Sequence, residues 1–291
     1  MAIRIVTADE RLSAAANKTS FAIFGPPGAG KTTLLKSLPP DSTLCLDLEA
    51  GMKSVQDWPG ASIPIRSYAD FRDIVVLASG PDPAVAPNAT YSEAHYVHAR
   101  AVHGPSGLEA FIASKAILFV DSITDLSRQV MTYAKQQPEA FSERTSKPDI
   151  RGAYGLLGRE IIHALKMLQH APGKTVIFVG VLEKVTDEFH VASWQPQMEG
   201  SKIGRELPGI VDQVMTLHFF SGAENELIFD EKGTVRRLVC RAGNPWGLPA
   251  KDRSGRLAET EAPDLGAILA KINAVPTVSP LARGASVSMT P

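Results

Sequence analysis

A glycine-rich segment near the start of the chain has the residue types and spacing that bind phosphate groups. Residues 25–32, Gly-Pro-Pro-Gly-Ala-Gly-Lys-Thr, fit the pattern G-x-x-x-x-G-K-[ST] at every position. The glycines let the backbone curl so that successive N–H groups point at phosphate oxygens, helped by the positive end of a following helix. We expect Lys31 to reach the β- and γ-phosphates and the Thr32 hydroxyl to contact Mg²⁺. The segment predicts a site for ATP and Mg²⁺, with nucleotide contacts from Gly25, Pro26, Pro27, Gly28, Ala29, Gly30, Lys31, Thr32 and Thr33.

Acidic residues at the ends of apolar strands extend this candidate chemistry. Asp121 ends the run 117–120, and a carboxylate at such a strand end holds Mg²⁺ in phosphate-loop proteins. Its alternative role is to cap the helix that follows. Glu49, in Asp47-Leu48-Glu49, ends the first strand after the phosphate loop. Because the carboxyl ends of adjacent parallel strands meet at one crevice, Glu49 is placed to deprotonate the water that attacks the γ-phosphate; the alternative is a solvated loop glutamate.

Alternating apolar strands and helices must position these residues. The pattern predicts strands over 20–24, 43–47, 63–65, 116–121 and 175–181, and helices over 31–38, 68–77, 122–137, 151–170 and 263–272. Strands are also predicted over 211–220, 226–229 and 235–240, with a hairpin turn at 230–233 between the last two. This alternation indicates an α/β fold with a mostly parallel sheet and a β-hairpin extension near the C-terminus.

Composition limits the class of protein. The chain has 291 residues, of which 44% are hydrophobic, enough for a sizeable core. Its 30 Lys and Arg balance 31 Asp and Glu, which excludes a strongly basic nucleic-acid binder and an acidic disordered chain but not a local basic groove. The cysteines, Cys45 and Cys240, match no metal spacing, and no apolar run reaches the roughly 18 residues of a membrane span. We therefore expect a soluble cytoplasmic protein.

The sequence predicts a single domain over residues 1–273. Prolines and small residues predict an irregular insertion at about 80–106, and polar stretches occur at 138–150 and 183–209. Residues 274–291 are expected to form a disordered tail, because Pro, Ser, Thr and Ala dominate there.

The phosphate loop, the Asp-x-Glu at 47–49 and Val120-Asp121-Ser122 together resemble the RecA/RadA recombinase core. The segments 151–155 and 207–212 are similar to a narrower group, the phage-encoded single-domain RecA-like ATPases, some of which anneal single strands. The similarity spans roughly residues 18–273. It implies a twisted, mostly parallel sheet flanked by helices, ATP and Mg²⁺ as cofactors, and a homo-oligomeric ring or filament. It also implies single-stranded DNA and a single-strand DNA-binding protein as partners, in a bacterial cytoplasm or a phage-infected cell.

The same resemblance assigns roles to the polar stretches. In RecA-like proteins the loops after the magnesium strand and after the next core strand face DNA. The candidate DNA contacts are Arg144, Lys147, Arg151, Lys184, Lys202 and Arg205, with His190 and Trp194 available for base stacking. Acidic residues share both stretches, so solvated loops are the alternative. The Gln that RecA-like proteins usually place after the second of these strands is missing, and Glu183 or Lys184 would have to replace it.

Lys251 and Arg253 are candidates for a cation that reaches the γ-phosphate of a neighbouring subunit. Lys202 and Arg205 are alternatives for this role, and an ordinary surface turn is the other interpretation of 251–255.

The sequence supports one leading hypothesis, an ATP-binding, Mg²⁺-dependent NTPase that acts on single-stranded DNA in recombination, annealing or repair. A second is a nucleotide-gated assembly or loading protein with little turnover. A small-molecule kinase is a third, for which the 80–106 insertion offers a poor lid.

Overall fold

A parallel sheet forms the centre of the molecule in the computed structural model, which describes residues 5, 7, 18–142, 147–186, 188–190, 192–222 and 227–274. Its core strands are β1 (Ser20–Gly25), β2 (Thr43–Asp47), β3 (Ala61–Pro64), β4 (Ile117–Asp121), β5 (Thr175–Thr186) and β7 (Gln213–Ser221). The remaining strands are β6 (Ala192–Pro196), β8 (Ile228–Phe229), β9 (Val235–Val239), β10 (Lys251–Asp252) and β11 (Thr260–Glu261).

The core strands lie in the order β7-β1-β5-β4-β2-β3 and are all parallel. Strands β9 and β11 extend the sheet beyond β7 in antiparallel fashion. This confirms the predicted α/β fold with a mostly parallel sheet. Because the core strands are parallel, their carboxyl ends all lie at one edge of the sheet, where Gly25, Asp47 and Asp121 are found.

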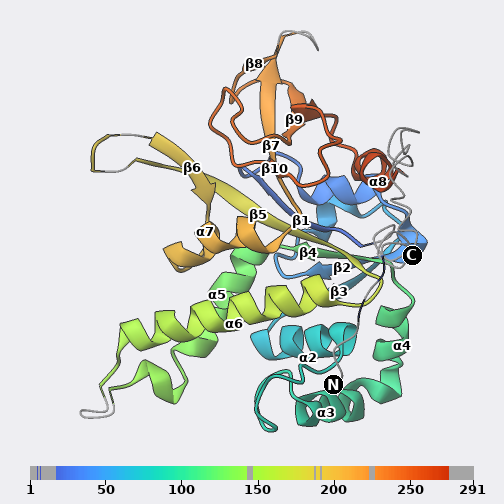
Figure 1. Cartoon of the computed structure of the whole chain (residues 1–291), viewed down its shortest axis with the longest axis vertical. Coiled ribbons are helices and arrows are strands. Elements are labelled where there is room, and N and C mark those ends of the chain that lie inside the picture. The colour runs from blue at the N-terminus through green and yellow to red at the C-terminus, as the bar shows by residue number, and fades with distance from the viewer. Residues whose placement is uncertain are drawn as a thin grey trace, which may run out of the picture.

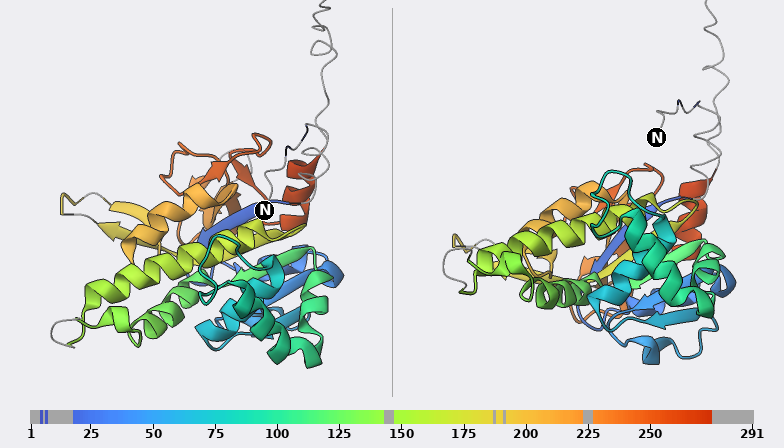
Figure 2. Two further views of the ribbon diagram at one scale, coloured as in Figure 1. Left: turned by 60° about the horizontal axis from the view of Figure 1, so that its bottom comes forward. Right: turned by 90° about the horizontal axis from the view of Figure 1, so that it is seen from below.

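Different helices cover the two faces of the sheet (Figure 1, Figure 2). On one face lie α2 (Tyr68–Ser79), α5 (Ile123–Ala134), α6 (Ile150–His170) and α7 (Ser201–Ile210), with α3 (Glu93–His103) and α4 (Leu108–Ala113) outside them. On the other lie the 3₁₀ helices η1 (Thr32–Ser37) and η3 (Met52–Val55) and helix α8 (Leu265–Asn273). Short 3₁₀ turns occur at η2 (Pro40–Ser42), η4 (Gly104–Ser106) and η5 (Pro138–Ala140). Alternate residues of β1 supply both cores, Ala22 and Phe24 to the first and Phe21 and Ile23 to the second.

The insertion predicted to be irregular over 80–106 contains helix α3. The Oγ of Ser92 accepts a hydrogen bond from the backbone N–H of His95 and so caps the start of this helix. Asp73 of α2 holds the helix in place, because its carboxylate contacts His95 Nε2 at 3.0 Å and His103 Nε2 at 2.9 Å. Regular structure in the insertion therefore begins at α3, and residues 80–91 form no helix or strand.

Other predicted elements differ from the structure in form. The helix predicted over 31–38 is the 3₁₀ helix η1. The polar stretch 183–209 is ordered where it is described, because β5 continues to Thr186, pairs antiparallel with β6 and is followed by α7. The β-rich extension is present, but β8 and β9 do not pair as the predicted hairpin. Each pairs antiparallel with β7 instead.

The predicted tail at 274–291 lies outside the described residues except for Ala274. Within the described part of the chain, the helices are all too short or too polar to cross a lipid bilayer.

Asp212 ties the start of β7 to the start of β1. Its Oδ2 accepts hydrogen bonds from the backbone N–H of Ser20 at 3.0 Å and from the Ser20 hydroxyl at 2.8 Å, and its Oδ1 lies 2.8 Å from Arg253. Asp212→Ala should lower the free energy of unfolding by about 2 kcal/mol, because it leaves the buried Ser20 groups without an acceptor. Urea unfolding measures the change. Arg253→Gln is the matched control and should cost less than about 0.5 kcal/mol, since that ion pair is exposed; an equal loss in both variants would place the stabilisation in the ion pair.

Candidate nucleotide-binding site

The phosphate loop connects β1 to η1 at the carboxyl edge of the sheet. Gly28 and Gly30 adopt φ angles of +78° and +90°, a region that residues with side chains rarely occupy. Gly25 is required for a different reason, because a Cβ there would lie 2.6 Å from the carbonyl oxygen of Leu217. The glycines thus allow both the curl of the loop and its close packing against β7.

Lys31 lies within the curl of this loop. Its side chain is buried, and Nζ donates hydrogen bonds to the carbonyl oxygens of Gly25 at 2.9 Å and Pro26 at 3.0 Å. Burial lowers the pKa of the ammonium group, and the carboxylates of Glu49 and Asp121 oppose that shift. The ammonium is therefore held among acceptors that a phosphate group can replace.

Thr32 and Asp121 meet beside the lysine. The Thr32 hydroxyl donates to Asp121 Oδ2 at 2.6 Å, while the buried Oδ1 has no hydrogen-bond partner within the described residues. Burial raises the pKa of Asp121 to about 6; the Thr32 hydrogen bond opposes this shift and the negative charge of Glu49 adds to it. A hydroxyl oxygen next to an unpartnered carboxylate oxygen fits Mg²⁺, which prefers hard oxygen ligands.

Glu49 lies next to this pair because its backbone is hydrogen-bonded to β4. The N–H groups of Leu48 and Glu49 both donate to the carbonyl oxygen of Asp121, at 2.7 Å and 3.2 Å. The carboxylate of Glu49 is exposed and close enough to affect the pKa values of both Lys31 and Asp121. Asp47 has a structural contact instead, since its Oδ1 accepts from the Gly51 N–H at 3.1 Å and shapes the loop after β2.

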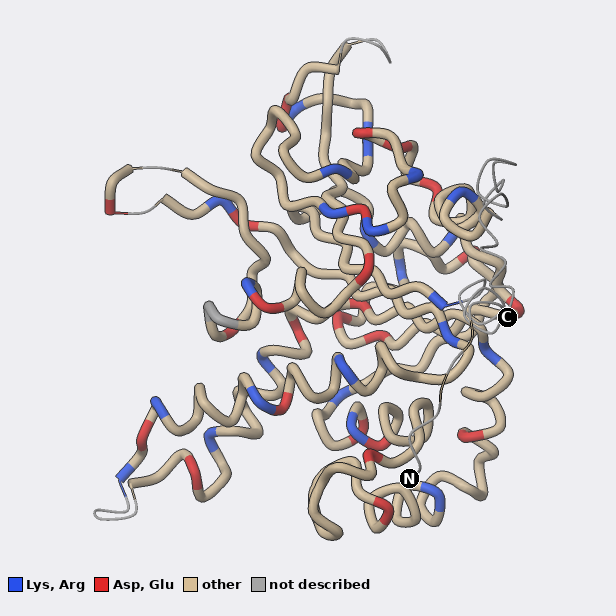
Figure 3. The backbone as a smooth tube through the Cα atoms, viewed as in Figure 1, with Lys and Arg blue, Asp and Glu red and all other residues tan. Residues whose placement is uncertain are grey.

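Two extensions project from the same side of the molecule (Figure 1). The arm consists of the C-terminal part of α5, η5 and the N-terminal part of α6, and the hairpin consists of residues 182–186 of β5 with β6. Helix α7 lies between them. Figure 3 shows that Lys and Arg residues alternate with Asp and Glu residues along the arm. The polar stretches predicted to face DNA thus form these extensions.

A cavity of about 790 Å³ opens between α6 and α7. Gly155 and Gly158 leave the backbone of α6 bare at this cavity, and nothing lies within 4 Å of the Cβ position of either. Arg151, Arg159 and the exposed ring of Tyr154 also line it. The sequence analysis did not predict that Tyr154 and Arg159 line this cavity with Arg151. Their spacing along the helix places them on one face with Arg151 and was the available signal.

The predicted DNA contacts are distributed unevenly over this surface. Arg151 lines the cavity, Arg205 is exposed on α7, and the backbone carbonyl of Lys147 accepts from Ser142 in the arm. Lys184 lies over the ring of Trp194 at 5.5 Å. That ring packs edge-on against His218 and Phe229, so Trp194 anchors the hairpin and is not a free platform for bases. Arg144 and the side chain of Lys202 lie outside the described residues.

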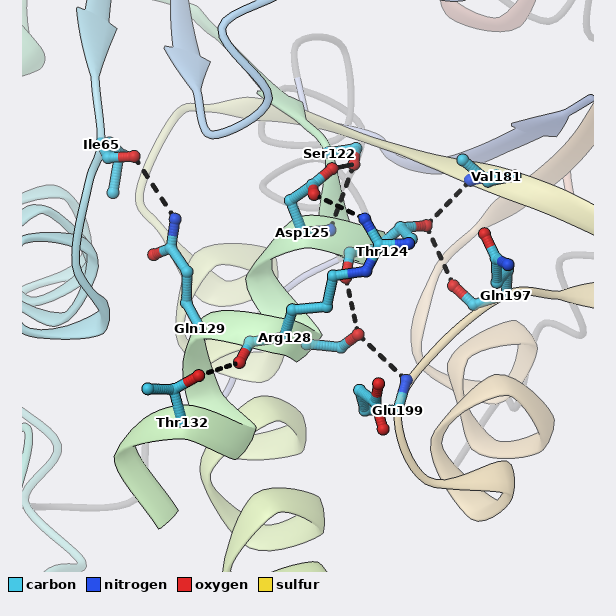
Figure 4. Close-up of polar contacts among 11 residues, drawn as sticks. Ile65, Ser122, Thr124, Asp125, Arg128, Gln129, Thr132, Val181, Gln197 and Glu199 are labelled. Carbon is cyan, nitrogen blue, oxygen red and sulfur yellow. Dashed lines mark hydrogen bonds and ion pairs between the residues drawn. The ribbon is translucent and has the colours of Figure 1, made fainter. Parts of the chain in front are cut away.

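Helix α5 links the hairpin to β4, the strand that ends at Asp121 (Figure 4). The Thr124 hydroxyl accepts from the Val181 N–H at 2.9 Å and donates to the Gln197 carbonyl at 3.0 Å, so it bridges both strands at the base of the hairpin. The Ser127 hydroxyl accepts from the Glu199 N–H at 3.0 Å. Thr124 lies in the first turn of α5, directly after Asp121 and Ser122, so the hairpin base is hydrogen-bonded to the helix that follows β4.

Lys251 and Arg253 make contacts within their own chain. Lys251 Nζ donates to the carbonyl oxygens of Pro208 at 2.6 Å and Val211 at 2.8 Å, at the C-terminal end of α7. Arg253 pairs with Asp212. Both lie near the start of β7, at the edge of the sheet opposite the phosphate loop. Their role toward a neighbouring subunit stays a prediction.

A phosphate loop, its lysine and a Thr–Asp pair at the carboxyl edge of a parallel α/β sheet define a P-loop NTPase domain. The model of the AAA_24 family, described as an AAA domain, matches residues 17–254, and the chain belongs to this family. No curated protein matches the chain.

Two solved structures are similar to the chain at low sequence identity. A prototypical ATPase from the type III secretion system of pathogenic bacteria is 15% identical, with a TM-score of 0.36 over 68% of this chain and 52% of that one. The chain therefore matches only about half the length of that ATPase. The RadB recombinase is 13% identical, with a TM-score of 0.34 over 76% of this chain and 79% of that one.

The buried charge of Asp121 gives a test of the metal site. In protein without Mg²⁺, a carboxylate whose folded pKa is about 6 lowers stability as the pH rises from about 4 to 6, because it ionises less readily folded than unfolded. Asp121→Asn should therefore raise the melting temperature in EDTA at neutral pH and reduce the extra stabilisation by Mg²⁺ with a non-hydrolysable ATP analogue. Differential scanning fluorimetry measures both. Asp125→Asn, in the first turn of α5 where the carboxylate accepts from the Ser122 hydroxyl, is the control and should leave the ligand-induced shift unchanged; a full shift in Asp121→Asn would remove Asp121 from the metal site.

Proposed function

We propose that this protein is a RecA-like, Mg²⁺-dependent ATPase that acts on single-stranded DNA in recombination, annealing or repair. One observation carries the catalytic part of the proposal: Lys31, the Thr32–Asp121 pair and Glu49 converge at one edge of the sheet. Each has the chemistry that ATP hydrolysis needs, a cation for phosphate, oxygen ligands for Mg²⁺ and a base for water.

The contacts of each residue indicate its role in ATP binding and hydrolysis. The loop N–H groups and Lys31 bind the phosphates, with the ammonium exchanging its carbonyl acceptors for phosphate oxygens. Thr32 and Asp121 would hold Mg²⁺, which neutralises charge on the β- and γ-phosphates when it is bound. Glu49 orients the attacking water and accepts its proton, since its carboxylate is exposed beside Lys31 and Asp121.

Glu49→Gln tests the assignment of the base. The amide keeps the shape of the side chain but cannot accept a proton, so hydrolysis should fall by ~10²-fold or more while ATP and Mg²⁺ still bind. Phosphate release measures the rate, and a fluorescent ATP analogue measures binding. Lys31→Ala is the comparison and should lose binding itself. A wild-type rate in Glu49→Gln would move the base to another residue.

The surface between the arm and the hairpin supports single-stranded DNA as the substrate. Arg151 and Arg159 offer charge-assisted contacts to phosphates at the cavity, and the exposed ring of Tyr154 offers a face for a base. The bare backbone at Gly155 and Gly158 permits close approach. Through the Thr124 bridge, binding at this surface would alter the nucleotide site. A homo-oligomer, a single-strand DNA-binding protein as partner and a cytoplasmic location belong to the same proposal.

An assembly or loading protein with slow turnover is the second candidate. The contacts of Lys251 and Arg253 within their own chain favour it, because they occupy the two leading candidates for the cation that reaches a neighbour's γ-phosphate. Steady-state ATP hydrolysis with and without single-stranded DNA, at low and moderate salt, separates the candidates. Stimulation that fades with salt supports the DNA-dependent ATPase, since phosphate contacts release counterions. Hydrolysis that ignores DNA supports the assembly role.

Thr124→Val tests the link between the two sites. The substitution preserves shape and removes both hydrogen bonds to the hairpin base, so DNA should lose its stimulating effect while basal hydrolysis stays within about twofold. Thr124→Ser should restore stimulation. Thr132→Val, which removes only a surface hydroxyl on the same helix, is the matched control. Full stimulation of Thr124→Val would show that the coupling runs elsewhere.

A further inference from the structure

Arg236 reaches the phosphate loop from β9. Strand β9 lies on the far side of β7 from β1, yet Arg236 Nη1 donates to the carbonyl oxygen of Ala29 at 3.4 Å. A Cβ on Gly30 would overlap the same nitrogen. The guanidinium is therefore packed directly against the last part of the loop, and a side chain at Gly30 would displace it.

The register of the strands explains how an arginine of β9 comes so close. Pairing of β1 with β7 ends at Phe24 and Thr216, whereas β7 continues and pairs Phe219 with Arg236. The C-terminal half of β7, together with β9, thus extends beyond the end of β1 and lies beside the phosphate loop. Leu238 belongs to the same core as Ala29, and Arg236 shares its face by the alternation of side chains along a strand.

Arg236 has no carboxylate partner within the described residues. Other arginines of the chain make ion pairs, such as Arg128 with Asp125 and Arg253 with Asp212. The side chain of Arg236 is half-buried, and its polar contact within the described residues is the one with the loop carbonyl. Its positive charge is therefore available at the loop, where phosphate groups are expected.

The peptide that Arg236 contacts has a particular geometry. The carbonyl of Ala29 and the N–H of Gly30 belong to one planar trans peptide and point in opposite directions. A guanidinium on the carbonyl side therefore favours an orientation in which the Gly30 N–H faces away from the guanidinium and is free to donate to a phosphate. Free rotation of this peptide would turn a carbonyl, which repels phosphate, toward the ligand.

We propose that Arg236 is a positioning residue for nucleotide binding, which holds the Ala29–Gly30 peptide in its phosphate-binding orientation. The role rests on the proposed ATP-binding function. Position 30 requires glycine for two reasons. Its φ angle is positive, and the guanidinium of Arg236 occupies the space that a side chain would need. The proposed role also makes the β7–β9 extension part of the nucleotide site and not only an addition to the sheet.

The test compares Arg236→Met and Arg236→Lys with the wild-type full-length protein. Methionine keeps the apolar stem and removes the donors, so the Kd for a non-hydrolysable ATP analogue and the KM for ATP should each rise about tenfold. Because Arg236 touches the loop and not the attacking water, kcat should stay within about twofold. Lysine keeps a cationic donor and should recover most of the affinity. Arg237→Met is the matched control, since Arg237 faces the other side of β9, and it should bind the analogue like the wild type.

Melting temperatures without nucleotide establish that the variants are folded. Wild-type Kd and KM in Arg236→Met would overturn the proposal, as would a fall in kcat at unchanged Kd. Equal loss of affinity in Arg236→Met and Arg237→Met would also overturn it, because the effect would then belong to the strand. If the wild-type protein does not bind the analogue, the proposed ATPase function itself fails, a result distinct from a failure of Arg236 alone.

Discussion

The short hydrogen bond between Thr32 and Asp121 joins the two segments on which the site depends. It brings the start of η1, which follows the phosphate loop, against the end of β4, although the residues are far apart in the sequence. The contact is possible because the core strands are parallel, so that every strand ends at the same edge. It also buries a carboxylate, and the raised pKa of Asp121 reflects the desolvation that follows. Its Oδ1 has no hydrogen-bond partner within the described residues, so a bound cation would neutralise this charge through that oxygen.

Strand β5 connects this edge to the outer surface. It runs between β1 and β4 in the sheet and then continues beyond the edge into the hairpin. At the carboxyl edge of the sheet, β5 therefore lies between the phosphate loop, which follows β1, and the end of β4 at Asp121. The hydroxyls of Thr124 and Ser127 bind the hairpin base to α5, so α5 contacts the hairpin as well as following the strand that carries Asp121. An element shared in this way is the physical basis by which one ligand can influence another.

The antiparallel strands beside β7 lie on the side of the phosphate loop opposite to β5. Because β8 and β9 both pair with β7, the extension is a small sheet that rises past the end of β1 and stands next to the phosphate loop. Gly25 and Gly30 lack side chains where these strands pack against the phosphate loop. Leu217 of β7 lies against Gly25, and Arg236 of β9 lies against Gly30. Two glycines of the loop thus serve packing as well as backbone conformation.

Local sequence determined the features that depend on neighbouring residues. The phosphate loop is specified by its glycines and lysine, and the buried strands by their continuous apolar runs, so these elements and the α/β class could be predicted. The proximity of Asp121 and Glu49 could be predicted because strand ends converge in any parallel sheet. Helix α3 was missed because prolines nearby masked the cap at Ser92, and the hairpin was missed because its alternate residues are polar on an extension exposed to solvent.

Only the tertiary structure decided the contacts between distant segments. Nothing near Arg236 in the sequence indicates the phosphate loop, since the contact arises from the register of β7 against both β1 and β9. The capping of α7 by Lys251 likewise depends on where β10 pairs. The chemistry of each side chain is known from the sequence alone. Strand register and the partners of a long cationic side chain, in contrast, result from the packing of the whole sheet.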